Sequence, residues 1–228
     1  IKPIKFGYSR LKYYPDRETN SIYKGISSIK GFGEKIDIAQ EMLQFKDNTY
    51  NTFVDLLIDI EENSNVGNSK LETLIKLNYF SQFGRNKKLL DIFQEFTKGK
   101  NRYDKKHKDK TKQQRIKALH EYEKTVENIA LPIAEQIAYE TDILGVPMSV
   151  YDLPKGTCYI IDLDLKNSPR ASVYGLSTGN LAEIKILKNH YKKLPFKKGD
   201  IVRFNVLKKK PKQRFLGYDE NTRPLFEP

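Results

Sequence analysis

The sequence predicts an α+β protein of two domains, with an all-α N-terminal domain and a five-stranded β-barrel as the C-terminal domain. Two observations predict this fold class. Apolar residues recur at helical spacing as far as residue 144. After Pro147 the pattern changes to short runs of β-branched and aromatic residues, which proline and glycine separate.

Helical periodicity first appears after about residue 27. Apolar residues recur at i, i+3 and i+4 or i+7 in four groups, at 36–43, 53–60, 71–75 and 89–96. Polar and glycine-containing segments between these groups predict breaks between helices. Residues 1–20 lack this period and are expected to be extended. The first predicted domain therefore covers residues 1–97, including this extended lead-in.

A connecting region is predicted at residues 98–149. Its first part, 98–112, is strongly basic and almost free of apolar residues, which predicts an exposed, mobile loop. A long helix is then expected from about Gln113 to Leu144. Pro132 lies inside this helix and should kink it or divide it in two, because proline has no backbone N–H and clashes with the preceding turn.

Residues 150–228 are expected to form the barrel domain. A short helical turn is expected at 189–194, and strands are predicted at 158–165, 171–176, 181–187, 200–206 and 214–218. Five short strands with an interruption between the third and the fourth are typical of a small closed barrel of the OB type.

The positive charge is concentrated in two stretches. Residues 98–117 carry ten lysines and arginines against two aspartates, a net +8, and residues 192–214 carry ten against one, a net +9. Because the whole chain carries +12, the remaining residues carry −5. Two basic stretches on an acidic body are typical of a surface that binds a polyanion.

Composition also excludes several classes of protein. The single cysteine, Cys158, cannot form an internal disulfide, so the reducing cytoplasm is the expected location. The three histidines (107, 120 and 190) have no ligand spacing, so no metal site is expected. No apolar run reaches about 18 residues, which argues against a membrane span. The chain opens with Ile1 and no secretion signal, so it is expected to begin inside a longer polypeptide or to have been trimmed.

A glycine-rich turn precedes the first predicted helix. Glycines 31 and 33 permit positive φ and leave no Cβ between the backbone and a partner. The amides of this hairpin and of the following helix N-terminus would then point outward together, as an anion site for one phosphate. The predicted phosphate-binding residues of this first hairpin are Lys30, Gly31, Phe32, Gly33 and Lys35.

A second, degenerate copy of this turn follows at residues 74–87. Its predicted phosphate-binding residues are Gly84, Arg85 and Lys87. Two copies predict a tandem helix-hairpin-helix unit that faces both strands of a duplex. Contacts to phosphates carry no direct base information, so the binding is expected to be independent of sequence.

The predicted barrel offers a second nucleic-acid site. A basic run lies between the last two predicted strands, a loop that contacts nucleic acids in OB barrels. Single strands are held by such charge together with stacking aromatic rings. The candidate residues are Tyr174, Lys208, Lys209, Lys210, Lys212 and Arg214.

Three segments carry a family resemblance. The runs IYKGISSIKGFGEKI (22–36), TFVDLLIDI (52–60) and LETLIKLNYFSQFGRNKKLL (71–90) resemble the tandem helix-hairpin-helix region of the bacterial DNA polymerase III alpha subunit. The approach with Pro3, Ile4 and Ser9, and the helix end with Glu140, Leu144, Gly145 and Ser149, are also similar to that family. Asn78-Tyr79-Phe80 stands where the family has Gly-Ala-Phe, and Val150-Tyr151 where it has His-Pro, which is typical of a phage-encoded or otherwise divergent relative.

The resemblance implies a role in replication. In that family the catalytic carboxylates and their Mg²⁺ lie in an upstream palm domain, so this segment would hold no catalytic residue and no cofactor. The tandem hairpins would hold duplex DNA behind the active site, and the OB domain would lie near the single-stranded template. The parent polypeptide would be a DNA-directed DNA polymerase, with the sliding clamp and other replisome subunits as candidate partners.

Other interpretations remain open. The chain could be a stand-alone replication accessory or protein-interaction module, which the parent reading frame would reveal. It could also be a nuclease that uses Asp162 and Asp164, because alternation places both carboxylates on one face of a strand. Residues 40–45 have the QxxLxF spacing of a clamp-binding peptide, but a helix with Leu43 facing the core is the favoured interpretation.

Overall fold

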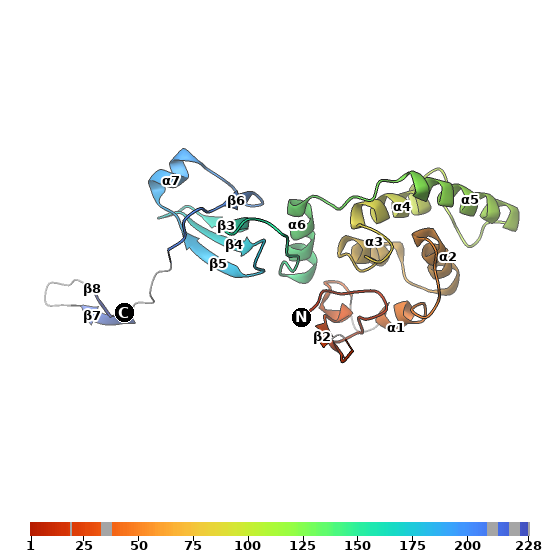
Figure 1. The fold of residues 1–228 in the computed structure, drawn as a ribbon, viewed down its shortest axis with the longest axis horizontal. Coiled ribbons are helices and arrows are strands. Elements are labelled where there is room, and N and C mark those ends of the chain that lie inside the picture. Colours follow the sequence, from red (N-terminus) through yellow and green to blue (C-terminus); the bar gives the residue numbers. More distant parts are fainter. Residues whose placement is uncertain (19, 33–37, 209–213, 219–223, 228) are drawn as a thin grey trace. The chain divides into compact units, whose positions relative to one another are not determined.

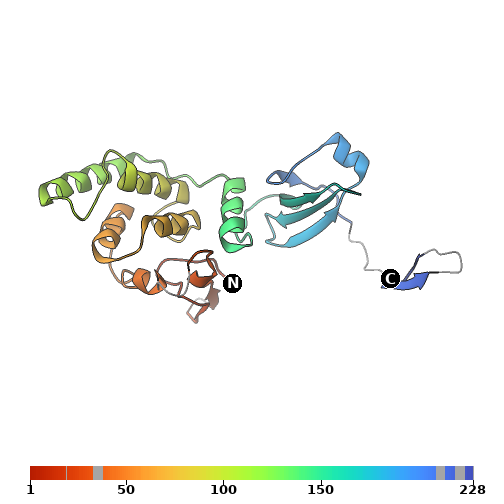
Figure 2. The ribbon, with the colours of Figure 1, turned by 180° about the vertical axis from the view of Figure 1, so that it is seen from behind.

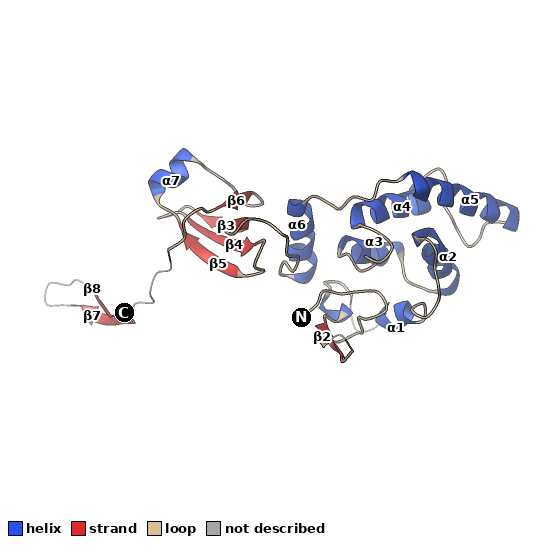
Figure 3. Ribbon diagram, in the orientation of Figure 1, coloured by secondary structure: helices blue, strands red, loops and turns tan. Residues whose placement is uncertain are grey.

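The structure, a computed structural model, describes residues 1–18, 20–32, 38–208, 214–218 and 224–227 (Figure 1). The chain forms two compact units, Ile1–Val150 and Tyr151–Pro228. Figure 2 shows the same ribbon from behind, and Figure 3 shows that the first unit is mostly helical and that the second is mostly strand. Each unit is described separately below.

The first unit contains a small hairpin followed by helices. The hairpin pairs β1 (Tyr14–Asp16) with β2 (Ser21–Tyr23), and a 3₁₀ turn, η1, follows at Ile26–Ser28. The helices are α1 (Ile38–Leu43), α2 (Phe53–Asn63), α3 (Asn68–Lys76), α4 (Asn86–Lys98), α5 (Asp109–Thr125) and α6 (Ile133–Leu144).

The apolar periodicity locates α2, α3 and α4 correctly. Their buried faces meet in one core, where Phe53, Leu74 and Ile92 are fully buried. At the start of α2, Thr52 and Asp55 form a reciprocal capping box, in which each side chain accepts from the other residue's amide. The predicted division at Pro132 is confirmed, because α5 ends at Thr125 and Pro132 is the N-cap of α6.

Two expectations for the first unit are wrong. The unit is not all-α, because the lead-in contains the β1–β2 hairpin. The segment 98–112 is not entirely an exposed loop, since α5 begins at Asp109 and Tyr103 is buried, stacked on Phe96 with ring centroids 5.6 Å apart. The aromatic ring anchors this basic stretch to the core, a tertiary contact that the local composition does not reveal.

The lead-in packs on the second hairpin. The Phe6 amide donates to the Tyr79 carbonyl at 2.8 Å, and the Phe6 ring contacts the rings of Tyr79, Phe80 and Phe83. Asn78 precedes this aromatic group with φ +59, a left-handed conformation that glycine adopts freely and that asparagine tolerates better than most residues. Asparagine is therefore compatible with this position of the turn.

Asn78→Gly is therefore expected to leave the free energy of unfolding nearly unchanged. Asn78→Val should lower it by about 1–2 kcal/mol, because a β-branched side chain is strained at positive φ. Urea titrations of the two variants, followed by circular dichroism, test this difference. Equal stability of Asn78→Gly and Asn78→Val would contradict the assigned backbone conformation.

A buried polar network connects α4, α6 and the turn after α6. The Asn86 side chain accepts from the Leu131 amide at 3.0 Å and donates to Gln136 Oε1 at 2.5 Å. Gln136 in turn donates to Glu140 at 2.9 Å. Glu140 also accepts from the amides of Met148 and Ser149 at 2.6 and 2.8 Å, so it orders the residues that follow the end of α6.

The second unit is built on an open sheet. Its strands are β3 (Thr157–Asp164), β4 (Arg170–Gly175), β5 (Leu181–Lys185) and β6 (Ile201–Arg203), in the antiparallel order β5-β4-β3-β6. Helix α7 (Lys188–Lys193) lies at the predicted helical turn. A small core on one face contains Ile160, Val173 and Ile186, with Tyr191 and Phe196 packed against it.

The predicted five-stranded OB barrel is wrong. The five predicted strands all form, but β7 (Arg214–Tyr218) pairs with an additional strand, β8 (Pro224–Glu227), in a separate two-stranded sheet. In the described part of the chain no barrel closes, because β7 bonds to its sequence neighbour and β6 pairs with β3 over only three residues. Strand periodicity reveals which residues are extended but not which strands are partners.

Candidate nucleic-acid interface

The first predicted hairpin has the backbone conformation that its glycine suggests. Gly31 has φ +79, and Lys30 is exposed. However, the Lys30 amide donates to the Ile143 carbonyl at 2.9 Å and the Phe32 amide donates to the Ile29 carbonyl at 3.1 Å. Because both amides already donate to carbonyls of the chain, an anion bound at this turn would need hydrogen-bond donors other than these two. Gly33 and Lys35 lie outside the described residues.

A lysine that the sequence did not indicate, Lys70, binds to this hairpin. Lys70 in α3 donates to the Gly31 carbonyl, and its Nζ lies 4.6 Å from the centroid of the Phe32 ring. Phe32 itself is buried, so it belongs to the core and does not face a ligand. No local signal marks Lys70, which is 39 residues away from Gly31 in the sequence.

The second predicted hairpin is also capped from within the chain. Gly84 has φ +147, and the Arg85 amide donates to Asn128 Oδ1 at 2.8 Å. Lys87 pairs with Asp91 one turn further along α4, with Nζ 2.5 Å from Oδ1. An incoming phosphate would therefore have to displace Asn128 from the start of α4, while the exposed Arg85 side chain remains available to it.

The residues predicted to bind nucleic acid in the second unit differ in their exposure, and several of them lie outside the described residues. Tyr174 is 2 % exposed and lies opposite Tyr159 in the sheet, so the expectation that its ring stacks on a base is corrected: the ring has no free face. Lys208 is exposed. Lys209, Lys210 and Lys212 lie outside the described residues. Arg214 begins β7, but its side chain is not described.

The residues of the nuclease hypothesis lie on the exposed face of β3. Asp162 and Asp164 are both exposed, and Asp164 accepts from the Lys166 amide at 2.9 Å. Among the described residues, no group of three or more His, Cys, Asp or Glu side chains could hold a metal ion. Cys158 is buried, and burial raises the pKa of its thiol.

The segment with clamp-peptide spacing belongs to the core of the first unit. Met42 is fully buried in α1, Phe45 is 2 % exposed, and Leu43 is partly buried. A peptide that inserts its side chains into a partner must be free to leave its own fold, which these contacts oppose. Within the described residues, no helix combines the length and the apolar character that crossing a bilayer requires.

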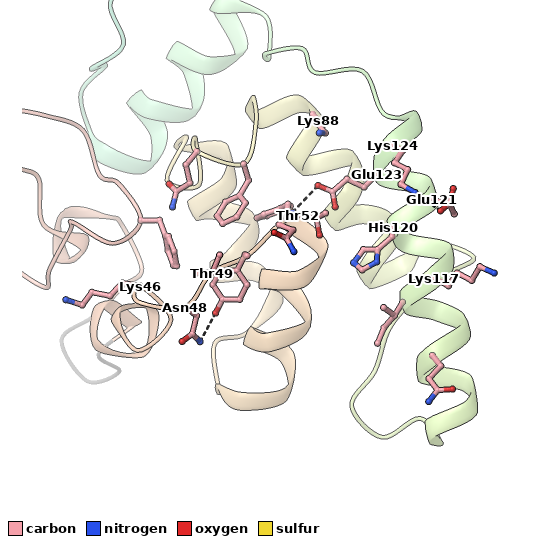
Figure 4. A pocket seen from close by; sticks show the side chains of 18 residues that line it. Lys46, Asn48, Thr49, Thr52, Lys88, Lys117, His120, Glu121, Glu123 and Lys124 are labelled. Atoms are coloured by element: carbon pink, nitrogen blue, oxygen red, sulfur yellow. Dashed lines mark hydrogen bonds and ion pairs between the residues drawn. The ribbon is translucent and has the colours of Figure 1, made fainter.

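A large hollow of the described surface lies in the first unit. It has a volume of about 1050 Å³ and lies between α5, the segment that leads into α2, and residues 82 and 83. We call it the α2–α5 groove, and we call Lys46, Lys88, Lys117 and Lys124 the groove lysines. Figure 4 shows Lys46 and Asn48 on one side of the groove and His120 and Lys117 on the other.

Helical spacing brings the residues of α5 into the groove. Lys117, His120 and Lys124 follow one another at i, i+3 and i+7, which places them on one face of a helix. His120 Nε2 lies 2.9 Å from Asp55 Oδ1 in α2. This spacing was visible in the sequence, but without the fold nothing indicated that this face borders a hollow.

A buried carboxylate holds α5 against the start of α2. Glu123 accepts from the Phe53 amide at 3.0 Å (Figure 4) and from the Val54 amide at 3.1 Å. These amides are the unsatisfied donors of a helix N-terminus, where a negative charge is stabilised. The Glu123 carboxylate is thus held by the start of α2.

Two aromatic rings line the groove with restrained orientations. The Tyr50 hydroxyl donates to Asp59 at 2.6 Å and accepts from Asn48 at 3.1 Å. Burial and the Asp59 carboxylate raise the pKa of Tyr50 to about 12. The Phe83 ring lies 5.8 Å from that of Phe53 and 6.3 Å from that of Tyr50. Tyr50 and Phe83 both remain partly exposed.

These features define a protein of two units whose helical unit presents a basic groove with aromatic walls. Such a combination of lysines and partly exposed rings is typical of surfaces that bind nucleic acids. Neither the scan against protein-family models nor the search of curated proteins finds a match to this chain.

Proposed function

We propose that this chain binds DNA through the phosphate backbone, without regard to base sequence, as the DNA-holding region of a replicative polymerase similar to the DNA polymerase III alpha subunit. One observation carries the proposal. Along residues 98–117 the described ion pairs are Arg102–Asp104 and Lys112–Glu62. Exposed lysines without an ion pair in this described stretch are Lys98, Lys100, Lys105, Lys106, Lys108, Lys110 and Lys117.

Exposed and unneutralised lysines have a specific physical consequence. Each lysine that neutralises a DNA phosphate releases condensed counterions, so the affinity depends steeply on salt. The basic stretch is held in place by Tyr103 and by the Lys112–Glu62 ion pair at 2.6 Å, which limits the entropy lost on binding. Lys30 and Arg85, both exposed at the two hairpins, add further positive charge to the same unit.

The salt dependence of duplex binding tests the proposal. If about five phosphates are neutralised, the logarithm of the association constant should fall with a slope near −4.5 against the logarithm of the salt concentration. Fluorescence anisotropy with a labelled duplex of arbitrary sequence measures this slope, and a second duplex of different sequence should give the same affinity. A slope near zero would refute DNA binding through phosphates.

A charge-matched pair of variants locates the interaction. The triple variant Lys106→Gln, Lys108→Gln, Lys110→Gln is expected to make the slope less steep by up to about 2.7, since each duplex phosphate contributes about 0.9. The control is Lys2→Gln, Lys12→Gln, Arg17→Gln, which removes the same charge from three other exposed positions of the first unit. Equal losses in the two triple variants would show a general charge effect and no defined interface.

The polymerase context rests on the resemblance of residues 22–36, 52–60 and 71–90. The reading frame upstream of Ile1 tests it. A palm-like α/β region with two aspartates separated by one residue is expected there. A start codon directly before Ile1 would instead favour a stand-alone DNA-binding accessory protein.

A further inference from the structure

We propose that the α2–α5 groove is a binding site for single-stranded DNA, in which unpaired bases stack on Tyr50 and Phe83 while the groove lysines neutralise phosphates. The inference rests on the proposed DNA binding and adds a site for a different form of DNA on the helical unit. It follows from the rings, the charges and the size of the groove.

The rings supply the contact that distinguishes unpaired bases. A base in a duplex is stacked on its neighbours, whereas an unpaired base can lie on an aromatic ring, and this contact does not depend on which base is present. Tyr50 is already held by Asp59 and Asn48, and Phe83 is held by Phe6 and Phe53, so little ring motion is lost on binding. Phe6 and Phe53 are buried, which leaves Tyr50 and Phe83 as the aromatic residues that offer exposed surface to the groove.

The charges of the groove favour an anion. Of the two glutamates that line it, Glu123 is engaged by the α2 amides and Glu121 pairs with Lys124 at 2.8 Å. Lys88 and Lys117 form no ion pair within the described part of the chain, and Lys46 lies 3.8 Å from its exposed neighbour Asp47. Amide and hydroxyl groups of Thr49, Asn51 and Gln113 also line the groove and can donate to phosphate or to base edges.

The size of the groove suits a short strand. A volume of about 1050 Å³ is close to the upper end of the range of roughly 300–1,000 Å³ for small-molecule pockets. Such a hollow accommodates a few unpaired nucleotides and not the body of a double helix.

The test compares a ten-nucleotide oligothymidylate with a duplex of the same length. Phe83→Leu keeps an apolar side chain of similar volume but removes the aromatic face, and it is expected to weaken oligothymidylate binding about tenfold, within the range measured for stacking on one base. Lys46→Gln with Lys88→Gln should make the single-strand salt slope less steep by about 1.4, since each phosphate contributes about 0.7 and neither lysine belongs to the basic stretch 98–117. Both variants should bind the duplex within about twofold of the parent chain.

Further outcomes separate this inference from the proposed function. If Lys106→Gln, Lys108→Gln, Lys110→Gln weakens duplex binding while the groove variants bind oligothymidylate as the parent does, the groove is not the single-strand site and DNA binding still stands. If neither set changes either affinity, both proposals fail. Competition by a ten-residue polyglutamate as strong as that by oligothymidylate would also overturn the inference, because it would show a site for acidic chains in general. The lysine variant alters an exposed side chain, Lys46, and a partly exposed one, Lys88, so its result holds even if Phe83→Leu proves unstable.

Discussion

Glu123→Ala is expected to lower the free energy of unfolding of the first unit by about 3 kcal/mol, because it removes two charge-assisted hydrogen bonds from a buried helix start. Glu123 is 7 % exposed and accepts from the amides of Phe53 and Val54 at 3.0 and 3.1 Å. Alanine would leave both amides without a partner, away from water. Glu123→Gln retains one acceptor oxygen, so its free energy of unfolding should fall by less than that of Glu123→Ala.

Urea denaturation, followed by circular dichroism, measures the free energy of unfolding of the Glu123 variants. Hydrogen exchange at the Phe53 and Val54 amides gives a local readout, since both should exchange faster in Glu123→Ala. Glu127→Ala is the matched control, because Glu127 is an exposed glutamate just beyond the end of α5. A Glu123→Ala variant as stable as Glu127→Ala would show that the carboxylate does not hold α5 against α2.

Glu140→Ala is also expected to lower the free energy of unfolding of the first unit by about 3 kcal/mol, because it removes charge-assisted hydrogen bonds at the end of α6. The Glu140 carboxylate accepts from the amides of Met148 and Ser149, from the Ser149 hydroxyl and from Gln136. Burial lowers the pKa of Lys24, and the charge of Glu140 opposes this effect. Removal of Glu140 is therefore expected to lower the pKa of Lys24 further.

Asp142→Ala is the control for Glu140, because Asp142 is an exposed acidic residue on the same helix. A thermal or urea transition of the first unit reports the stability, and NMR titration of the Lys24 side chain reports its pKa. The measurements are independent. If Glu140→Ala and Asp142→Ala unfold at the same urea concentration, the assigned network from Asn86 to Ser149 does not stabilise the unit.

Local patterns were sufficient to locate most elements. Apolar spacing identified α2, α3 and α4, and alternation identified the strands from β3 to β7, because each pattern records which face of an element is buried. Pro132 correctly marked the division between α5 and α6, since the restriction it imposes acts on its own turn of helix. These properties depend on neighbours only a few residues away.

Contacts between distant residues account for the failures. The Arg85 amide, predicted to bind phosphate, donates instead to the side chain of Asn128, 43 residues further along the chain. Tyr174 was the preferred candidate for a ring that stacks on a base, but it is 2 % exposed in the folded unit. The barrel was expected because five strands were found, yet β7 pairs with β8. None of these partners leaves a periodic signal in the sequence.

By itself the sequence determined where helices and strands form and where the positive charge is concentrated, because both depend on residue type and on spacing of a few residues. The tertiary structure decided which backbone amides are used within the fold, which rings remain exposed, and which lysines share a groove. The physical reason is that packing brings together residues such as Phe53 and Glu123, which are 70 positions apart. It thereby gives buried polar groups such as the Glu123 carboxylate partners that local pattern does not specify.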